Sequence, residues 1–99
     1  MDLTSKQRRY LKGAAHHLKP VVQVGGRGIV QEVVDKVNME LECHELIKVR
    51  VADDDRQARA LMAERVVAET GCALVQTIGK TWVLYRPRKK KPTIRLPKE

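Results

Sequence analysis

The apolar residues of this 99-residue chain change their spacing repeatedly, and this pattern constrains the fold more than any single motif does. Segments with apolar residues at about every third or fourth position, as in helices, alternate with short β-branched segments typical of strands. Because helices and strands alternate, most strands must be joined through helices. The pattern predicts the order α-β-α-β-α-β-β in a single domain.

Three segments have the spacing of amphipathic helices. The first begins at a capping-box pattern, Thr4 followed by Gln7, and ends before Pro20, since the residue before a proline avoids helical backbone. The third is expected to be capped by residues 53–55, all aspartates, and to end at Gly71. The predicted buried faces are Leu11, Ala14, Ala15 and Leu18 in the first helix, Val30, Val33, Val34, Val37 and Leu41 in the second, and Ala58, Leu61, Met62 and Val66 in the third.

Four short segments are expected to be strands, at residues 21–24, 46–51, 73–78 and 81–86. Gly79-Lys80 forms a two-residue turn of the Gly-X hairpin type, so the last two strands must be antiparallel. Strands joined through helices tend to be parallel, with right-handed crossovers. The sequence therefore predicts an α/β fold, a single open sandwich in which three helices cover a four-stranded mixed sheet. Residues 88–99, rich in Pro and Lys, are expected to be a flexible basic tail beyond a domain of residues 1–87.

Basic residues are concentrated at both ends of the sequence. Lys and Arg number 20 against 12 acids, which gives a formal net charge of +8. Residues 1–30 carry +5, residues 31–85 carry −3 and residues 86–99 carry +6. Such an excess indicates a polyanionic partner, nucleic acid or less often a membrane surface. No segment has the length of a membrane span or the apolar run of a signal peptide, so we expect a soluble, cytoplasmic protein. We also expect a monomer that binds nucleic acid and no membrane.

A glycine-rich segment stands between the first predicted strand and the second predicted helix. It consists of Gly25, Gly26, Arg27 and Gly28. Glycines let a phosphate approach backbone N–H groups, the helix N-terminus adds partial positive charge, and Arg27 can contact a phosphate or stack on a base. A plain tight turn that needs positive φ is the alternative that the spacing leaves open. The segment has neither the G-x-x-x-x-G-K-[ST] nor the G-x-G-x-x-G pattern of nucleotide-binding loops.

Cations of the first predicted helix and of the C-terminal segment are the other binding candidates. In the helix, Lys6, Arg9 and Lys12 are expected to share a solvent-facing stripe, for which a merely solvated face is the alternative. The C-terminal cations would form an arm that contacts phosphates, or else a solubilising tail. The complete set of candidate RNA-binding residues is Lys6, Arg9, Lys12, Lys19, Gly25, Gly26, Arg27, Gly28, Arg86 and Arg88.

The remaining chemistry-bearing residues indicate neither catalysis nor a cofactor. Tyr10, Trp82 and Tyr85 are the only aromatic residues, too few for a base-stacking platform, and Trp82 is expected to be a packing or rim residue. Cys43 and Cys72 are expected to be buried free thiols. The histidines, at positions 16, 17 and 44, are expected at the surface, with no zinc-ligand spacing. We therefore expect no enzyme, no cofactor and no metal site.

Three motifs together resemble one family: LTSKQRRYLKGAAHHLKPVVQVGGRGI at the start, LIKVRV, and QTIGKTWVLYR. The chain is similar, over residues 2 to about 87, to the YhbY-type CRM domain (chloroplast RNA splicing and ribosome maturation). The resemblance implies a fold similar to the C-terminal domain of translation initiation factor three. It also implies that residues 25–28 form a GxxG loop that clamps RNA, with Lys6, Arg9 and Lys12 as matching basic positions.

The same resemblance implies a partner. Bacterial members associate with precursors of the large ribosomal subunit, whereas plant relatives bind group II introns. The hypothesis is therefore a ribosome-assembly factor bound to rRNA. The alternative is a protein-interaction adapter that docks on a ribosomal protein or a GTPase. No role for the chain after Arg88 is implied.

Overall fold

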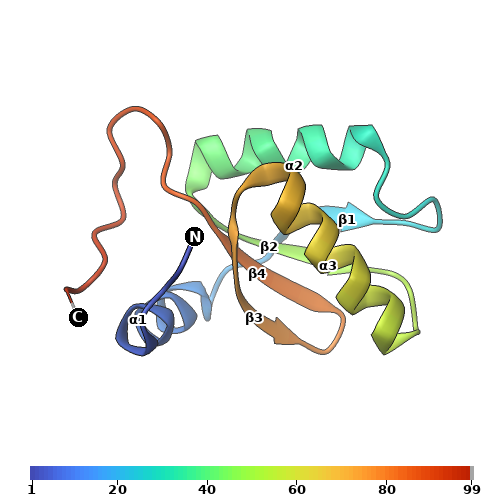
Figure 1. The fold of residues 1–99 in the computed structure, drawn as a ribbon, viewed down its shortest axis with the longest axis horizontal. Helices are drawn as coiled ribbons and strands as arrows, with labels where there is room; N and C mark the ends of the chain where they lie inside the picture. Colours follow the sequence, from blue (N-terminus) through green and yellow to red (C-terminus); the bar gives the residue numbers. More distant parts are fainter. Residues whose placement is uncertain (99) are drawn as a thin grey trace.

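The computed structural model describes residues 1–98 and has the predicted order of elements. The helices are α1 (Ser5–Ala15), α2 (Gln31–His44) and α3 (Arg56–Thr70), and the strands are β1 (Pro20–Val24), β2 (Leu46–Val51), β3 (Ala73–Ile78) and β4 (Thr81–Tyr85). The sheet has the order β1-β2-β4-β3, in which β1 is parallel to β2 while β4 is antiparallel to both of its neighbours (Figure 1). The prediction of a mixed, four-stranded α/β sandwich is confirmed.

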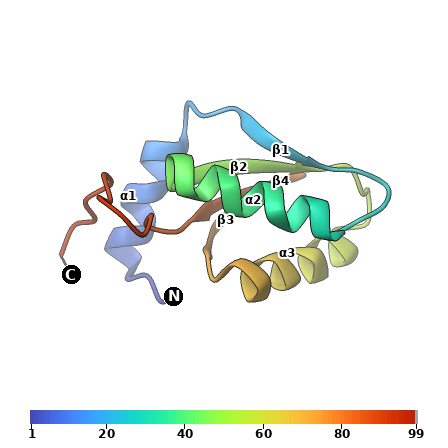
Figure 2. The same cartoon turned by 90° about the horizontal axis from the view of Figure 1, so that it is seen from above.

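The sheet separates two apolar cores, because its strands bury side chains on both faces. Helices α2 and α3 pack on one face, and α1 lies on the other (Figures 1 and 2). The α2–α3 core includes Val24, Val34, Val37, Leu41, Val49, Val51, Val66, Trp82 and Leu84. The α1 core consists of Leu11, Ala15, Leu46, Val75, Val83 and Tyr85. Trp82, at 1% exposure, is a core residue, which decides between the packing and rim positions that the sequence left open.

Local signals fix the start of α1, but the helix ends earlier than predicted. The capping box forms, since the Gln7 N–H donates to Thr4 Oγ1 and the Thr4 N–H donates to Gln7 Oε1, both at 3.1 Å. The helix ends at Ala15, and Pro20 is the first residue of β1. Leu18 therefore lies outside the helix, although it still packs against the α1 core.

Helix α3 has the predicted ends but a different buried face. Asp55 caps it by accepting the Gln57 N–H at 2.9 Å, and Gly71 ends it with a φ of 72°. Leu61, predicted to be buried, is 63% exposed, and Ala63 is buried instead. Positions two residues apart lie about 200° apart on a helix, so both cannot face the core. The prediction failed because a broad apolar stripe leaves the rotation of a helix open.

The two cysteines have different environments. Cys72 is buried as expected, and burial raises the pKa of its thiol. Cys43 is exposed, so the prediction that both thiols are buried was wrong for this residue. It lies near the end of α2 on the side turned away from the sheet, where helical residues meet solvent.

Residues 86–97, which we call the C-terminal strap, fold back against the domain instead of forming the expected free tail (Figures 1 and 2). Ile94 and Leu96 pack against the α1 core. The side-chain amide of Gln7 donates to the Pro97 carbonyl at 3.2 Å. The strap also binds a buried carboxylate, that of Glu45. Apolar and polar contacts together therefore hold a segment whose composition alone indicated disorder.

Candidate nucleic-acid interface

Residues 25–28 form a tight turn, called the glycine turn below, between β1 and α2. The Gly28 N–H donates to the Gly25 carbonyl at 3.1 Å, which closes the turn. Within residues 1–98, no backbone or side-chain acceptor takes the N–H groups of Gly25, Gly26 or Arg27. Consecutive free amides in a turn form a concavity suited to an anion.

The structure distinguishes the two interpretations of these glycines. Gly28 has a φ of 73°, so the turn itself requires glycine at this position. Gly25 and Gly26 do not have positive φ, and an added Cβ atom at either position would meet no atom of the protein within 4 Å. The fold therefore gives no reason for glycine at these two positions. The requirement of a tight turn thus accounts for Gly28 and not for Gly25 or Gly26.

The helix N-terminus contributes less to this site than the sequence suggested. Ile29 and Val30 separate the glycine turn from the first residue of α2. Glu32, in the first turn of α2, lies 3.8 Å from the Arg27 guanidinium, and the two side chains are 81% and 79% exposed. An ion pair this exposed contributes only about 0–1 kcal/mol. A phosphate can therefore replace Glu32 beside Arg27, with the turn amides as its main donors.

Helix α1 presents its cations beside a groove on the face of the sheet that α1 covers. Arg9 and Lys12 line this groove of about 580 Å³, together with strand residues that include Lys48 and Gln76. Lys6 is exposed three positions before Arg9, on the same side of the helix. The predicted stripe of Lys6, Arg9 and Lys12 therefore forms, and it borders the sheet.

Strand β2 supplies two further cations on the same face. Lys48 and Arg50 lie two residues apart in β2 and so point to the same side of the sheet. The Lys48 ammonium donates to the His16 carbonyl, just after α1, at 3.3 Å. Arg50 is exposed and lies in register with Gln23 of β1 and Thr81 of β4. These two cations were not among the predicted site residues.

Helix α1 leaves part of this face uncovered, and we call that part the open sheet face. It consists of Gln23, Lys48, Arg50, Gln76, Ile78 and Thr81. None of these side chains is aromatic, because Trp82 and Tyr85 are buried and Tyr10 lies on α1. The face can therefore offer cations, amides and a hydroxyl to a polynucleotide, but no stacking platform.

The open sheet face connects the two predicted binding elements. Figure 1 shows α1 and the β1–α2 connection toward opposite ends of the sheet, so the α1 cations and the glycine turn are not in direct contact. Val24 lies in register with Val51, immediately before Gly25 and immediately after Arg50. Lys48 and Arg50 thus lie along the path from α1 to the glycine turn.

Three of the predicted binding residues lie elsewhere. Arg86 donates to the carbonyl of Thr70 at 2.6 Å and to the side chain of Asn38 at 2.8 Å, and it pairs with Glu42 at 3.2 Å. Arg88 donates to the Cys43 carbonyl at 2.8 Å. Both guanidinium groups therefore join the strap to the helices and are engaged within the protein.

Lys19 is exposed in the α1–β1 connection. It lines a separate groove with Leu18 and Val21. Its place in the chain, one residue before β1, puts it at the end of the strand away from the glycine turn. Lys19, Arg86 and Arg88 therefore lie apart from the glycine turn, the open sheet face and the cations of α1.

Acidic residues also lie near the glycine turn, in the β2–α3 connection. The Ala52 N–H donates to the Val24 carbonyl at 2.9 Å, which brings this connection beside the turn. Asp53 accepts the Asp55 N–H at 2.8 Å, and Asp54 forms an ion pair with Lys80, which lowers the pKa of its carboxyl. The Lys80 ammonium offsets the charge of Asp54, whereas Asp53 is hydrogen-bonded only to a backbone N–H and keeps its charge.

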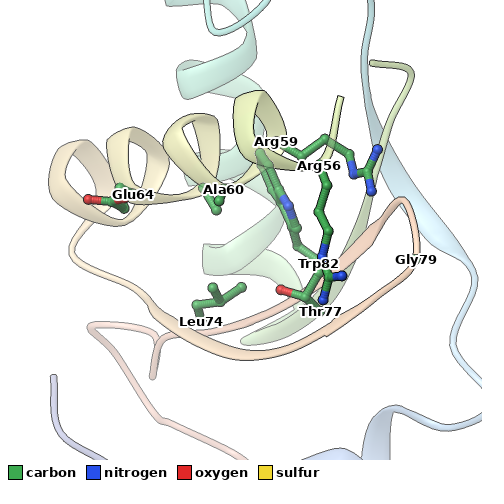
Figure 3. A pocket seen from close by; sticks show the side chains of 9 residues that line it. Arg56, Arg59, Ala60, Glu64, Leu74, Thr77, Gly79 and Trp82 are labelled. Atoms are coloured by element: carbon green, nitrogen blue, oxygen red, sulfur yellow. The ribbon is translucent and has the colours of Figure 1, made fainter. Parts of the chain in front are cut away.

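A second hollow lies between α3 and the β3–β4 hairpin, on the α3 side of the sheet (Figure 3). It measures about 610 Å³ and is lined by Arg56, Arg59, Thr77 and Trp82 among others. The Arg56 side chain extends across it toward Thr77, beside the almost fully buried indole of Trp82 (Figure 3). Because it opens on the opposite side, we treat it as separate from the open sheet face.

The fold and this surface define a class of protein: a small α/β domain that has a cationic sheet face without aromatic side chains and a glycine turn with free amides. None of the helices within residues 1–98 combines the length and apolarity that crossing a membrane requires. Residues 3–86 match the CRS1/YhbY (CRM) domain, and the chain belongs to this family.

Relatives of known sequence share most of this chain. It is 47% identical over 97 residues to a Haemophilus influenzae protein named "RNA-binding protein", covering 98% of this chain and 97% of that one. It is 42% identical to a Bacillus subtilis protein named "Probable RNA-binding protein YqeI", covering 96% and 99%. A Zea mays CRM-domain containing factor is 28% identical over 86 residues, which are 87% of this chain and 10% of the plant protein.

A solved structure has the same fold. The solution structure of a Staphylococcus aureus protein matches with a TM-score of 0.84 and 38% identity. The match covers 97% of this chain and 100% of that one. The arrangement of three helices around a mixed sheet is therefore shared across this level of sequence divergence.

Proposed function

We propose that this protein binds RNA through a surface formed by the glycine turn, the open sheet face and the cations of α1. The observation that carries the proposal is a series of backbone amides without acceptors and of cations without carboxylate partners along one face of the sheet. Arg9, Lys12, Lys48 and Arg50 form no ion pair among the described residues. The names of the bacterial relatives support RNA as the polyanion.

The mode of recognition in this proposal is contact with the sugar-phosphate backbone. Amides of the glycine turn and Arg27 take one phosphate group, and Lys48 and Arg50 take phosphates along the sheet. Gln23, Gln76 and Thr81 add hydrogen-bonding groups for ribose hydroxyls, which distinguish RNA from DNA. Specificity then comes from the shape of the RNA, because the open sheet face has no aromatic side chain on which bases could stack.

The RNA in this proposal is rRNA in precursors of the large ribosomal subunit, and the protein acts as an assembly factor. This finer statement depends on the family resemblance. The role is one of binding and not catalysis. A protein-interaction adapter remains the competing function, and nuclease treatment separates the two. Co-sedimentation with large-subunit precursors should disappear after RNase digestion if RNA holds the complex, and survive if a ribosomal protein holds it.

The salt dependence of binding tests the proposal on the purified protein. With four to six phosphate contacts, the slope of log K against log salt concentration should be about −3 to −4, at ~0.7 per contact for single strands. A filter-binding titration of the wild-type protein measures it. A slope near zero would show that the protein does not bind RNA through its phosphates.

A further inference from the structure

A second group of cations lies on the opposite side of the sheet from the open sheet face. Lys89, Lys90 and Lys91 are exposed and consecutive, and they form the bend of the C-terminal strap. The Lys89 N–H donates to Glu42 Oε1 of α2 at 3.4 Å, so the bend begins beside α2. Figure 1 shows the bend at the level of α2, with α1 on the other side of the sheet. We call these three residues the lysine bend.

A buried carboxylate fixes the two ends of this bend. Glu45 is fully buried and accepts the N–H of Arg88 at 3.0 Å, just before the bend. It also accepts the N–H and the hydroxyl of Thr93, at 2.8 and 2.6 Å, and the N–H of Ile94 at 3.0 Å, just after the bend. One side chain therefore closes a short loop of the strap.

The backbone of this region is held in place as well. Glu45 has a φ of 66°, in the left-handed region that non-glycine residues rarely adopt. Its carbonyl accepts the Arg86 N–H at 2.9 Å. Such a conformation persists only where the surroundings determine it. The contacts to the strap provide those surroundings.

No carboxylate pairs with the three lysine side chains among the described residues. A preorganised loop of like charges loses little conformational entropy when it binds, which favours it over a flexible tail of the same composition. Phosphates of a polynucleotide are the ligands that such a cluster contacts without sequence preference. The fixed loop and the free charges together indicate a function beyond solubility.

We propose that the lysine bend is a second RNA contact site, fixed by Glu45 across the sheet from the first, so that one copy of the protein holds two separate RNA segments. This inference rests on the proposed RNA binding. The first site takes one segment along the open sheet face, and the lysine bend takes a second segment by its phosphates. A protein of this kind would bring two parts of a folding RNA together.

Energy transfer between two RNA hairpins tests this directly. One hairpin carries a donor dye and the other an acceptor, and each is too short to reach both sites. The wild-type protein should produce energy transfer, and native mass spectrometry should find one protein with two hairpins. With the variant K89Q/K90Q/K91Q, the energy-transfer signal should be at least tenfold lower, while the variant still binds one hairpin.

Two controls separate position from charge. The variant K36Q/R56Q/R65Q removes the same charge from α2 and α3, Arg56 being the cation that extends into the hollow beside α3, and should bridge like the wild type. E45Q leaves every lysine in place and raises the net charge by one, and this change in charge alone would strengthen RNA binding. We expect E45Q to bridge several-fold less, because it loosens the loop. Circular dichroism establishes that each variant is folded.

Several results would overturn the inference. These are complexes of one protein with one hairpin only, complexes of two proteins with two hairpins, or undiminished energy transfer with K89Q/K90Q/K91Q. Undiminished bridging by folded E45Q would overturn the role of the fixed loop. Failure of the wild-type protein to bind even one hairpin is a different result, since it contradicts the proposed function itself.

Discussion

The carboxylate of Glu45 accepts the backbone N–H of Ile94 at 3.0 Å, across 49 positions of the sequence. Burial alone would raise the pKa of this carboxyl, but hydrogen bonds from Thr93, Arg88 and Ile94 outweigh burial and lower the pKa from 4.5 to about 2. The charged form of Glu45 is thus the one that the fold stabilises. This relationship makes the C-terminal strap part of the domain.

The stability of the protein should therefore depend on pH in acid. A carboxyl whose pKa is lower in the folded state contributes stability above its unfolded pKa of about 4.5, and this contribution is lost as the pH falls toward 2. The loss should be about 2 to 3 kcal/mol. Urea unfolding between pH 7 and pH 2 measures it. Other acids titrate in the same range, so the difference between wild type and E45Q isolates this group; a constant difference would contradict the prediction.

Alanine substitutions in the glycine turn should separate binding from stability. Gly25→Ala and Gly26→Ala should leave the free energy of unfolding within about 0.5 kcal/mol, since a Cβ atom meets nothing within 4 Å. RNA affinity should fall about tenfold, because the Cβ atom holds a phosphate away from the amides. Gly28→Ala is the control and should cost roughly 1–2 kcal/mol of stability through its positive φ. Unchanged RNA affinity in Gly25→Ala and Gly26→Ala would show that the glycine turn does not contact RNA.

Substitutions of two neighbouring arginines of α1 should affect different properties, stability for Arg8 and RNA binding for Arg9. The Arg8 guanidinium donates to the carbonyls of Leu74 and Val75 at 2.7 and 2.9 Å, where β3 has a bulge. Arg8→Ala should cost about 1.5–3 kcal/mol, since it leaves two carbonyls without a charged donor. Arg9→Ala should leave stability almost unchanged and weaken RNA binding. Thermal unfolding and filter binding of both variants check this, and equal effects of the two variants on binding would refute the assignment.

The strand cations should each contribute to the salt dependence. Lys48→Gln and Arg50→Gln should each make the slope of log K against log salt less negative by about 0.7 to 0.9. Lys36→Gln is the matched control, because Lys36 is on α2 and pairs with Glu40 at 3.2 Å. Its slope should equal that of the wild type. Identical slopes for all three variants would show that β2 does not contact phosphate.

Local patterns were sufficient to predict the elements of the fold and to identify the glycine turn of the candidate site. The Thr4–Gln7 capping box, the Asp55 cap and the Gly79-Lys80 turn are each determined by residues a few positions apart. The glycine turn was identified by its composition alone. The alternation in β2 also placed Lys48 and Arg50 on one face, but it did not show that α1 leaves this part of the face uncovered.

Long-range contacts account for what the sequence did not predict. Nothing within residues 88–97 indicates that Glu45 binds them, because the contact joins segments more than forty positions apart. The same holds for Arg86, a basic residue by composition that is engaged with Asn38 and Thr70. Arg8 and Arg9 are adjacent and chemically identical, and only the position of β3 distinguishes them. Tertiary packing therefore decides which cations remain available for a ligand.

Backbone amide chemical shifts, followed by NMR as an RNA hairpin is added, test the central claim most directly. If RNA binds as proposed, the largest changes should occur at Gly25, Gly26 and Arg27 and along the open sheet face at Arg50. The outward sides of α2 and α3 should change little. Changes confined to those helices, with the glycine turn and Arg50 unaffected, would contradict the account.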